Sequence, residues 1–148
     1  MLDDGERFAY SANHIAEMIQ CLFAKRVVFH RQDGEVAPGI TLHRMQGHTM
    51  GMQSVRVRTP RGWVLLASDA SHYYEHWLKR IPFSICWSRE DLLSSYKLFE
   101  KLAESEDHVI PGHDPLVKNL YPHSSTDLGP EAVRLDLNPS RPVKGLFS

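Results

Sequence analysis

Two histidines and one aspartate follow apolar runs of this 148-residue chain, at positions where strands would end. His48 lies in the stretch QGHTMGMQS, Asp69 follows the apolar run WVLLAS, and His113 lies in VIPGHDP. Imidazole nitrogen and carboxylate oxygen are zinc ligands, and polar residues that follow strands gather at the rim of a sheet. Gly47 and Gly112 precede the two histidines and leave space beside them. The sequence therefore makes His48, Asp69 and His113 candidate metal ligands.

Each of these residues also has an ordinary structural explanation. A histidine between glycine and threonine is a common loop residue, and an aspartate after a serine often caps a helix. A second ligand set is conceivable, because Asp69, His72 and His76 are spaced to share one helix face, where solvent-facing histidines are the alternative. No spacing argument applies to three further histidines, which are expected to be surface or structural residues: His30, His108 and His123.

The hydrophobic pattern predicts the elements that would position the candidate ligands. Helices are predicted at residues 12–25 and 88–103, the second with a capping box formed by Ser88 and Asp91. Strands are predicted at residues 27–29, 40–42, 53–59, 63–67 and 108–110, and turns at 33–34, 38–39 and 60–62. Residues 1–148 are expected to form a single domain of the α+β class, in which residues 123–148 are an irregular tail.

Composition excludes several classes of protein. The charged residues, 17 basic and 18 acidic, give a net charge of −1, which argues against nucleic acid or an anionic membrane as a partner. No run approaches the roughly 18 apolar residues of a membrane span, and the acidic start MLDDGERF is not a signal peptide. Cys21 and Cys86 are isolated, which predicts a cytoplasmic protein with reduced thiols.

Three segments in this order, GHTMGMQS, SDASHYYE and PGHDP, resemble motifs of the metallo-β-lactamase superfamily and its N-acyl-homoserine lactonase-like branch. The resemblance covers roughly residues 26–122. It implies an αβ/βα sandwich with two zinc ions, or other divalent metals, that opens a cyclic ester by means of a metal-bound hydroxide. It also implies that His48 binds the first metal, that His113 binds the second, and that Asp69 bridges both.

The resemblance further implies contacts with a lactone or ester substrate. A tyrosine shortly after the bridging aspartate assists catalysis in the lactonases, but the third residue after Asp69 is His72. Tyr73 is therefore assigned to catalysis together with Asp69 and His72, with packing at a helix start as the alternative for the tyrosine. Three alternating apolar residues of IPFSICW are assigned to substrate binding, with cover by a helix as the alternative: Phe83, Ile85 and Trp87.

One motif of the superfamily, HxHxDH, is absent from this sequence. Two protein ligands then remain for each ion, whereas a catalytic zinc has about three. We therefore expect the chain to correspond to the C-terminal part of the sandwich, to bind fewer than two zinc ions, and to be inactive alone. Two alternatives stay open: a non-catalytic half-domain that binds a partner or forms a homodimer through an exposed sheet face, or a split site that another chain completes.

Overall fold

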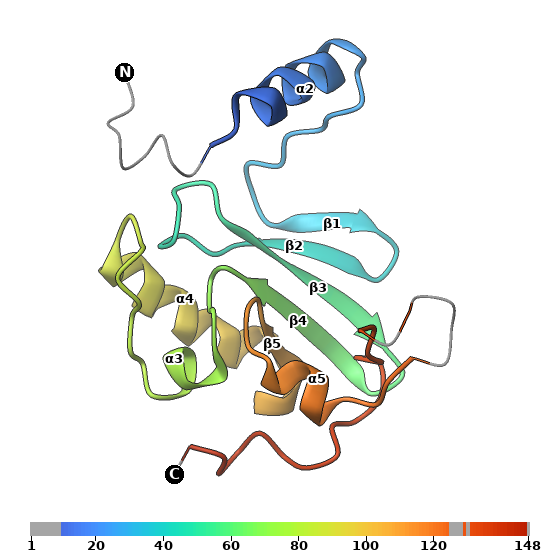
Figure 1. Ribbon diagram of the computed structural model, residues 1–148, viewed down its shortest axis with the longest axis vertical. Helices are drawn as coiled ribbons and strands as arrows, with labels where there is room; N and C mark the ends of the chain where they lie inside the picture. Colours follow the sequence, from blue (N-terminus) through green and yellow to red (C-terminus); the bar gives the residue numbers. More distant parts are fainter. Residues whose placement is uncertain (1–9, 125–128, 130, 148) are drawn as a thin grey trace. The chain divides into compact units, whose positions relative to one another are not determined.

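The structure, a computed structural model, describes residues 10–124, 129 and 131–147, and the chain divides into two compact units, Met1–Arg31 and Gln32–Ser148. Helices and strands are mixed along the chain, so the fold is of the α+β class (Figure 1). The elements are α2 (Ala12–Phe23), β1 (Gly34–Ala37), β2 (Ile40–Arg44), β3 (Gln53–Thr59), β4 (Gly62–Ser68), α3 (Tyr74–Leu78), α4 (Arg89–Leu102), η1 (Glu106–His108), β5 (Val109–Pro111) and α5 (Leu116–Leu120).

The first unit contributes α2, which confirms the helix predicted at residues 12–25. Its apolar residues recur at helical spacing, yet they are exposed by 42% to 50%: Ile15, Met18, Ile19 and Leu22. The strand predicted at residues 27–29 is wrong, since these residues have no regular secondary structure and no strand partner among the described residues. Apolar, β-branched composition alone does not make a strand, because the backbone groups need a paired neighbour.

A five-stranded sheet in the order β1-β2-β3-β4-β5 forms the centre of the second unit. Strands β1 to β4 are an antiparallel meander, and β5 pairs with β4 in parallel. The strands predicted at residues 40–42, 53–59 and 63–67 are confirmed as β2, β3 and β4. The turn predicted at residues 33–34 is wrong, because Gly34 begins β1 and the Asp33 carboxylate accepts the backbone N–H of Arg44 at 2.8 Å.

Strand β4 is buried on both faces, as its continuous apolar sequence predicts. Leu65 and Ala67 point to one face and pack with buried residues of α4, whereas Val64 points to the other face. Helix α5 and the C-terminal segment cover that second face through Leu120 and Val143. The β4–β5 part of the sheet therefore lies between two layers, and Figure 1 shows α4 and α5 beside it.

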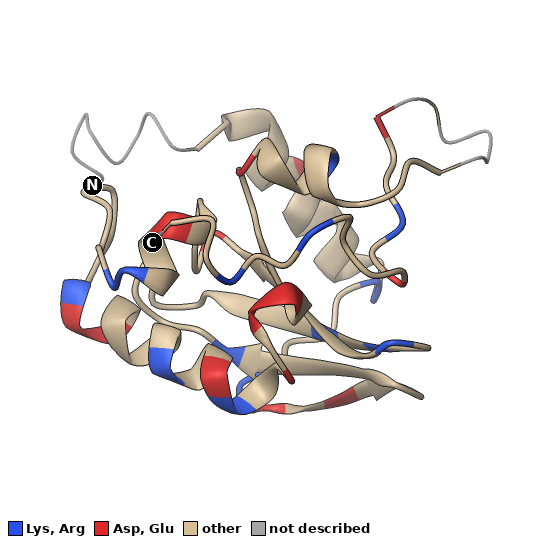
Figure 2. Cartoon of the chain, turned by 90° about the horizontal axis from the view of Figure 1, so that it is seen from below, with Lys and Arg blue, Asp and Glu red and all other residues tan. Residues whose placement is uncertain are grey.

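Helix α4 begins as its sequence predicts. The Ser88 hydroxyl accepts the backbone N–H of Asp91 at 3.1 Å, and the apolar face of the helix is buried through Leu92, Tyr96 and Phe99. Figure 2 shows charged residues of both signs interspersed over the helices and strands. Within the described part of the chain, no helix has the length and apolar character of a membrane span.

The C-terminal segment is packed although it contains no helix or longer strand where it is described. His123 and Val133 form an isolated bridge, and the backbone N–H of Val143 donates to the Asp107 carboxylate at 2.6 Å. The predicted irregular tail also includes residues 125–128, 130 and 148, and these lie outside the described residues, as does the N-terminal stretch MLDDGERF.

Burial raises the pKa of Tyr74, Tyr96 and Tyr121 in the second unit, that of Tyr96 to about 12. In the unfolded chain a tyrosine has a pKa of about 10, which is lower than the pKa of these three residues in the folded protein. Their contribution to the free energy of unfolding is therefore complete below about pH 10 and is lost as the pH rises further. Urea unfolding between about pH 8 and about pH 11 is expected to show a free energy that falls above about pH 10. Tyr96→Phe should make this decrease shallower, and an unchanged slope would contradict the assignment.

Candidate metal centre

The parallel pairing of β4 with β5 brings Asp69 and His113 to the same edge of the sheet. Ser68, the last residue of β4, pairs with Pro111, the last residue of β5. Parallel strands end in the same direction, so the loops that follow them start side by side. Nε2 of His113 lies 2.5 Å from Oδ1 of Asp69, although the two residues are 44 positions apart.

The two loops are also joined by backbone hydrogen bonds beyond the strands. Gly112 donates its N–H to the carbonyl of Ser71 at 2.9 Å, and His113 donates to the carbonyl of His72 at 3.0 Å. This pairing is tight, because a Cβ atom on Gly112 would lie 2.8 Å from the carbonyl carbon and oxygen of Ser68. A glycine is therefore required before the histidine, and the pairing places His72 next to His113.

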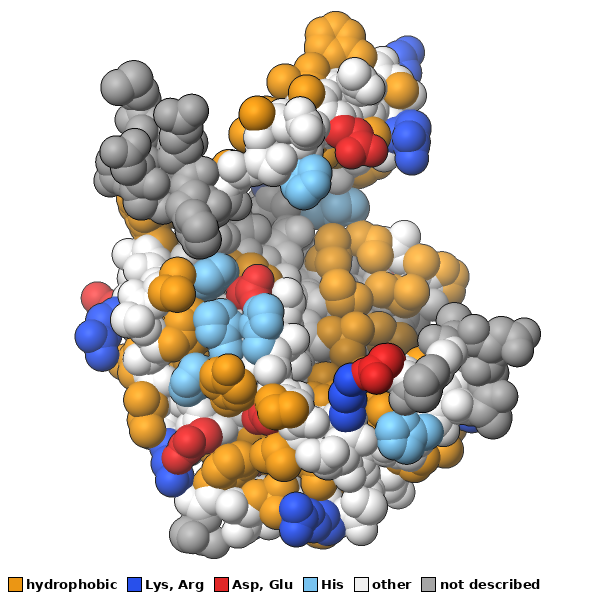
Figure 3. Space-filling model, in the orientation of Figure 1, with side chains coloured by type: hydrophobic (Ala, Val, Ile, Leu, Met, Phe, Trp, Pro, Cys, Tyr) orange, Lys and Arg blue, Asp and Glu red, His pale blue; other side chains and the backbone are white. Residues whose placement is uncertain are grey.

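Asp69, His72 and His113 together form a compact set of ligand atoms, which we call the Asp–His–His cluster. One ligand atom from each residue lies within 4.8 Å of the others, and Nε2 of His72 is 3.9 Å from Oδ1 of Asp69. Ligands of a tetrahedral zinc, each about 2.0–2.1 Å from the ion, are roughly 3.3–3.5 Å apart. Small side-chain movements would bring these three atoms to that spacing, so they fit a metal ion. Figure 3 shows histidines gathered around one acidic side chain on this face.

His48 lies beside this cluster and is held by the segment before α4. Gly47 packs so closely against Leu92 that a Cβ atom would lie 2.5 Å from its backbone, and the φ of +135° at Gly47 also favours glycine. Nδ1 of His48 is 2.8 Å from the carbonyl oxygen of Ile85, and its ring centroid is 5.6 Å from that of His72. Since a carbonyl only accepts hydrogen bonds, Nδ1 carries a proton, and in the neutral tautomer that this bond selects Nε2 has the lone pair.

Burial and neighbouring imidazoles favour the neutral form of His72. Burial lowers its pKa most, and the nearby His113 lowers it further, while the Asp69 carboxylate opposes both effects. Burial also lowers the pKa of His76. Neutral imidazole is the form that binds metals, so the surroundings of His72 prepare it to be a ligand.

The helical set of Asp69, His72 and His76, which the spacing made conceivable, is not formed. Helix α3 begins at Tyr74, so Asp69 and His72 lie in the preceding loop and His76 alone is helical. His113 takes the third place in the cluster instead. The sequence contained no local signal for this exchange, because it depends on the pairing of β4 with β5.

The tyrosines after the cluster have different surroundings. Tyr74 is fully buried at the start of α3, and its backbone N–H donates to the Asp114 carboxylate at 2.9 Å. Tyr73 is 43% exposed, with its ring 5.1 Å from that of His76. Asp114, which no sequence argument identified, also accepts the N–H of Leu116 and so fixes the loop after His113.

The three apolar residues assigned to substrate binding differ in their surroundings. Phe83 stacks on His72, with ring centroids 3.8 Å apart and planes inclined by 16°. Ile85 is 72% exposed and Trp87 is 65% exposed. Phe83 therefore supports an imidazole, and the other two present apolar surface on the segment that also holds His48.

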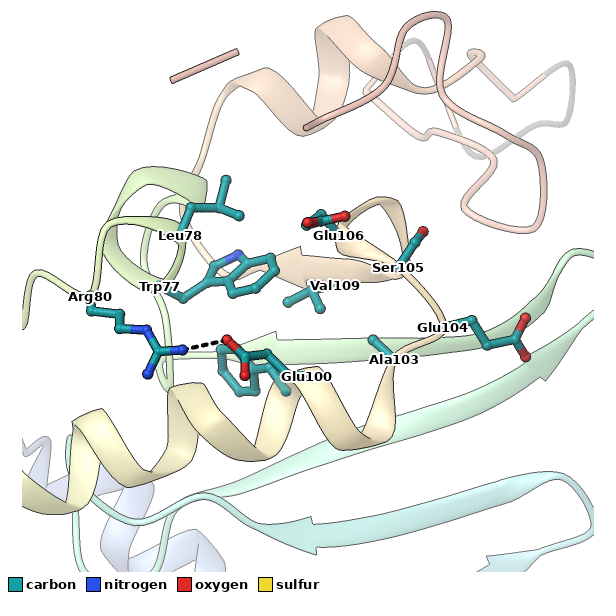
Figure 4. A pocket seen from close by; sticks show the side chains of 10 residues that line it. Trp77, Leu78, Arg80, Glu100, Ala103, Glu104, Ser105, Glu106 and Val109 are labelled. Atoms are coloured by element: carbon teal, nitrogen blue, oxygen red, sulfur yellow. Dashed lines mark hydrogen bonds and ion pairs between the residues drawn. The ribbon is translucent and has the colours of Figure 1, made fainter. Parts of the chain in front are cut away.

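A cavity of about 400 Å³ lies elsewhere in the second unit, between α3, α4 and η1 (Figure 4). Trp77, Phe99 and Val109 line it, and an ion pair between Arg80 and Glu100 at 2.7 Å borders it. No residue of the Asp–His–His cluster lines this cavity. The candidate metal ligands therefore lie outside this cavity, in the loops that follow β4 and β5.

Comparison with curated proteins identifies N-acyl homoserine lactonases as relatives. The chain is 39% identical over 83 residues to the enzyme from a Bacillus species and 37% identical over 83 residues to that from Bacillus cereus. It is 38% identical over 84 residues to AiiA from Bacillus thuringiensis subsp. kurstaki. In each case the match covers 55% of this chain and 33% of the relative, so the chain spans about a third of the curated relatives that it matches. No protein-family model matches the sequence.

Solved structures show the same relationship at the level of the fold. A structure of N-acyl homoserine lactone hydrolase, with the product N-hexanoyl-L-homoserine bound at the catalytic metal centre, is 34% identical and aligns with a TM-score of 0.55 over 61% of this chain and 36% of that chain. The dizinc quorum-quenching lactonase AidC is 16% identical and aligns with a TM-score of 0.56 over 76% and 39% of the two chains. The chain therefore shares part of the metallo-β-lactamase fold.

The close approach at Gly112 provides a test of the scaffold. Gly112→Ala is expected to lower the free energy of unfolding by about 1–3 kcal/mol, because its Cβ atom would press on the Ser68 backbone. Gly51→Ala is the matched control, since a Cβ atom there has no neighbour within 4 Å, and its effect should stay within about 0.5 kcal/mol. Urea unfolding of both variants measures the difference. Equal effects would show that the loop pairing does not require glycine.

Proposed function

We propose that this chain, a homologue of N-acyl homoserine lactonases over about a third of their length, contributes to the metal-dependent hydrolysis of a lactone or related ester. The observation that carries the proposal is the contact between Asp69 and His113 at the ends of two parallel strands, with His48 and His72 beside them. These residues also occur along the chain in the same order as the matching motifs of the lactonase-like branch, which supports the same proposal.

Zinc is the proposed metal, and other divalent metals accept the same donor atoms. His48 and His113 would each bind one ion, and Asp69 would bridge the two through its two carboxylate oxygens. A bound divalent metal would polarise the ester carbonyl and lower the pKa of water at the site. The hydrogen bond from Nδ1 of His48 to the carbonyl of Ile85 supports this role, because it directs the lone pair of Nε2 away from the backbone.

A lactone with an apolar substituent is the proposed substrate. Ile85 and Trp87 present apolar surface on the segment that positions His48, and such side chains would contact an acyl or aromatic group. Tyr73 is exposed, and its ring lies near that of His76. Its hydroxyl would donate a hydrogen bond to the oxyanion that develops on the substrate. The net charge of −1 and the free cysteines suit a neutral substrate and a cytoplasmic location.

The number of ligands limits what the chain does alone. Asp69, His72, His113 and His48 supply ligand-type side chains at this edge, whereas two catalytic zinc ions with about three protein ligands each need more. We propose that further ligands, carried on an HxHxDH segment, complete the active site. The alternative is a binding or dimerising module that uses the half-buried sheet face of Leu42, Val55 and Val57.

The test compares the 148-residue chain with a chimera. The chimera joins residues 26–122 to the segment of a Bacillus N-acyl homoserine lactonase that this chain does not match, so that HxHxDH is supplied. The chain alone is expected to open N-acyl homoserine lactones no faster than background, and the zinc-loaded chimera at about 1 s⁻¹ or faster. Proton release at constant pH measures lactone opening.

Asp69→Asn in the chimera should remove most of this rate, because a neutral amide does not offset two neighbouring cations. Glu75→Gln is the control, since Glu75 pairs with Lys79 on the exposed face of α3 and should leave the rate unchanged. Rapid turnover by the 148-residue chain alone would show that no further ligands are needed. An active chimera that tolerates Asp69→Asn would contradict the metal-bridging role.

A further inference from the structure

The Asp–His–His cluster differs from the set that motif resemblance implies, because it contains His72. His72 is 20% exposed and its ring centroid is 4.8 Å from that of His113. His48, by comparison, lies outside the group of mutually close ligand atoms, and its Nδ1 is engaged by the carbonyl of Ile85. The described part of this chain therefore supplies three donor residues for one metal ion, without a contribution from an HxHxDH segment.

These three donors are held by the backbone and not by chance proximity of surface side chains. The N–H of Ala70 donates to the carbonyl of Ala67 at 3.1 Å, and that of Ser71 donates to the carbonyl of Ser68 at 3.2 Å, so Asp69 lies within two overlapping tight turns that lead to His72. The N–H of His113 then donates directly to the carbonyl of His72. The backbones of His72 and His113 are thus joined directly and the backbone around Asp69 is held by its turns, which lowers the entropy that would be lost when a metal binds.

Phe83 fixes the orientation of the His72 ring. The two rings are parallel to within 16°, with centroids 3.8 Å apart, so the imidazole turns little about its χ2 angle. In this orientation Nε2 of His72 lies 3.9 Å from Oδ1 of Asp69. Nε2 of His113 approaches the same oxygen. Both imidazole nitrogens therefore lie close to the same carboxylate oxygen, and the three donor atoms are within 4.8 Å of one another.

We propose that Asp69, His72 and His113 form a binding site for one divalent transition-metal ion that is complete within this chain. The donor set is two imidazoles and one carboxylate with an open side, because His113 is 57% exposed. Three protein ligands and an open position suit zinc, and cobalt is a spectroscopic substitute. The proposal rests on the proposed function in treating Asp69 and His113 as ligands, and it adds His72 and a stoichiometry of one ion.

The test uses the full 148-residue chain, freed of metal with a chelator and titrated with Co²⁺ alone and then with Zn²⁺ in competition. Wild type is expected to bind one ion per chain and to show the visible absorption of four- or five-coordinate Co²⁺. His72→Phe keeps an aromatic ring against Phe83 but removes the nitrogen, so the fold should persist while the metal affinity falls by about 100-fold or more. Circular dichroism verifies the fold of each variant.

Glu75→Gln is the control, because Glu75 pairs with Lys79 on the exposed face of α3, and the affinity should change by less than about threefold. His72→Cys should restore Co²⁺ binding and add the charge-transfer absorption of a thiolate ligand. Full affinity in His72→Phe would overturn the proposal, as would a folded wild type that binds no ion or two ions equally. These results do not depend on lactone turnover, so they are separate from the test of the proposed function.

Discussion

The site depends on one constraint, the parallel pairing of β4 with β5. The preceding strands form an antiparallel meander, in which consecutive strands end at opposite edges of the sheet. The chain returns through α4 before β5, and this crossover lets Ser68 and Pro111 end at the same edge. Because a side chain at residue 112 would collide with the Ser68 backbone, the pairing extends past the strands only with glycine there. The loops that carry Asp69 and His113 are neighbours for this reason.

The same loops also start two helices that are too short to be stable alone. Helices α3 and α5 have five residues each, far fewer than an isolated helix needs in water. One carboxylate holds both starts, because Asp114 accepts the N–H of Tyr74 through Oδ2 and that of Leu116 through Oδ1. Asp114 follows His113 directly, so a substitution that moves this loop would disturb the helices and the cluster together. Stability and ligand position are therefore coupled at this edge of the sheet.

Local signals predicted the elements whose causes are local. The Ser88 cap and the apolar spacing of α4 gave the helix start and its buried face, and the alternation in β3 gave that strand. Strand β1 was missed because Gly34–Ala37 has little strand propensity and forms by pairing with β2. For the site, sequence reasoning identified Asp69 and His113 from their positions after strands, and their contact follows from the sheet. It grouped His72 with Asp69 and His76 on a helix face, and with Asp69 and Tyr73 for catalysis, but not with His113, because that contact depends on the stack with Phe83 and on the hydrogen bond from His113.

The geometry of the Asp69 carboxylate makes a one-ion cluster and a two-ion active site compatible. Nε2 of His72 and Nε2 of His113 lie 3.9 Å and 2.5 Å from Oδ1, so these three atoms form one group of donors around a single carboxylate oxygen. The second oxygen of a carboxylate is free to face a different cation, which is how one side chain holds two ions about 3.5–4 Å apart. A second ion on that side would need ligands of its own, and His48 is a candidate, because its ring centroid is 5.6 Å from that of His72 and its Nδ1 is held by the carbonyl of Ile85. An ion bound first by Asp69, His72 and His113 would fix the carboxylate and so reduce the entropic cost of the second ion. In this order of binding, the ion held by the Asp–His–His cluster would prepare the Asp69 carboxylate for the second ion, whose other ligands come from outside the cluster.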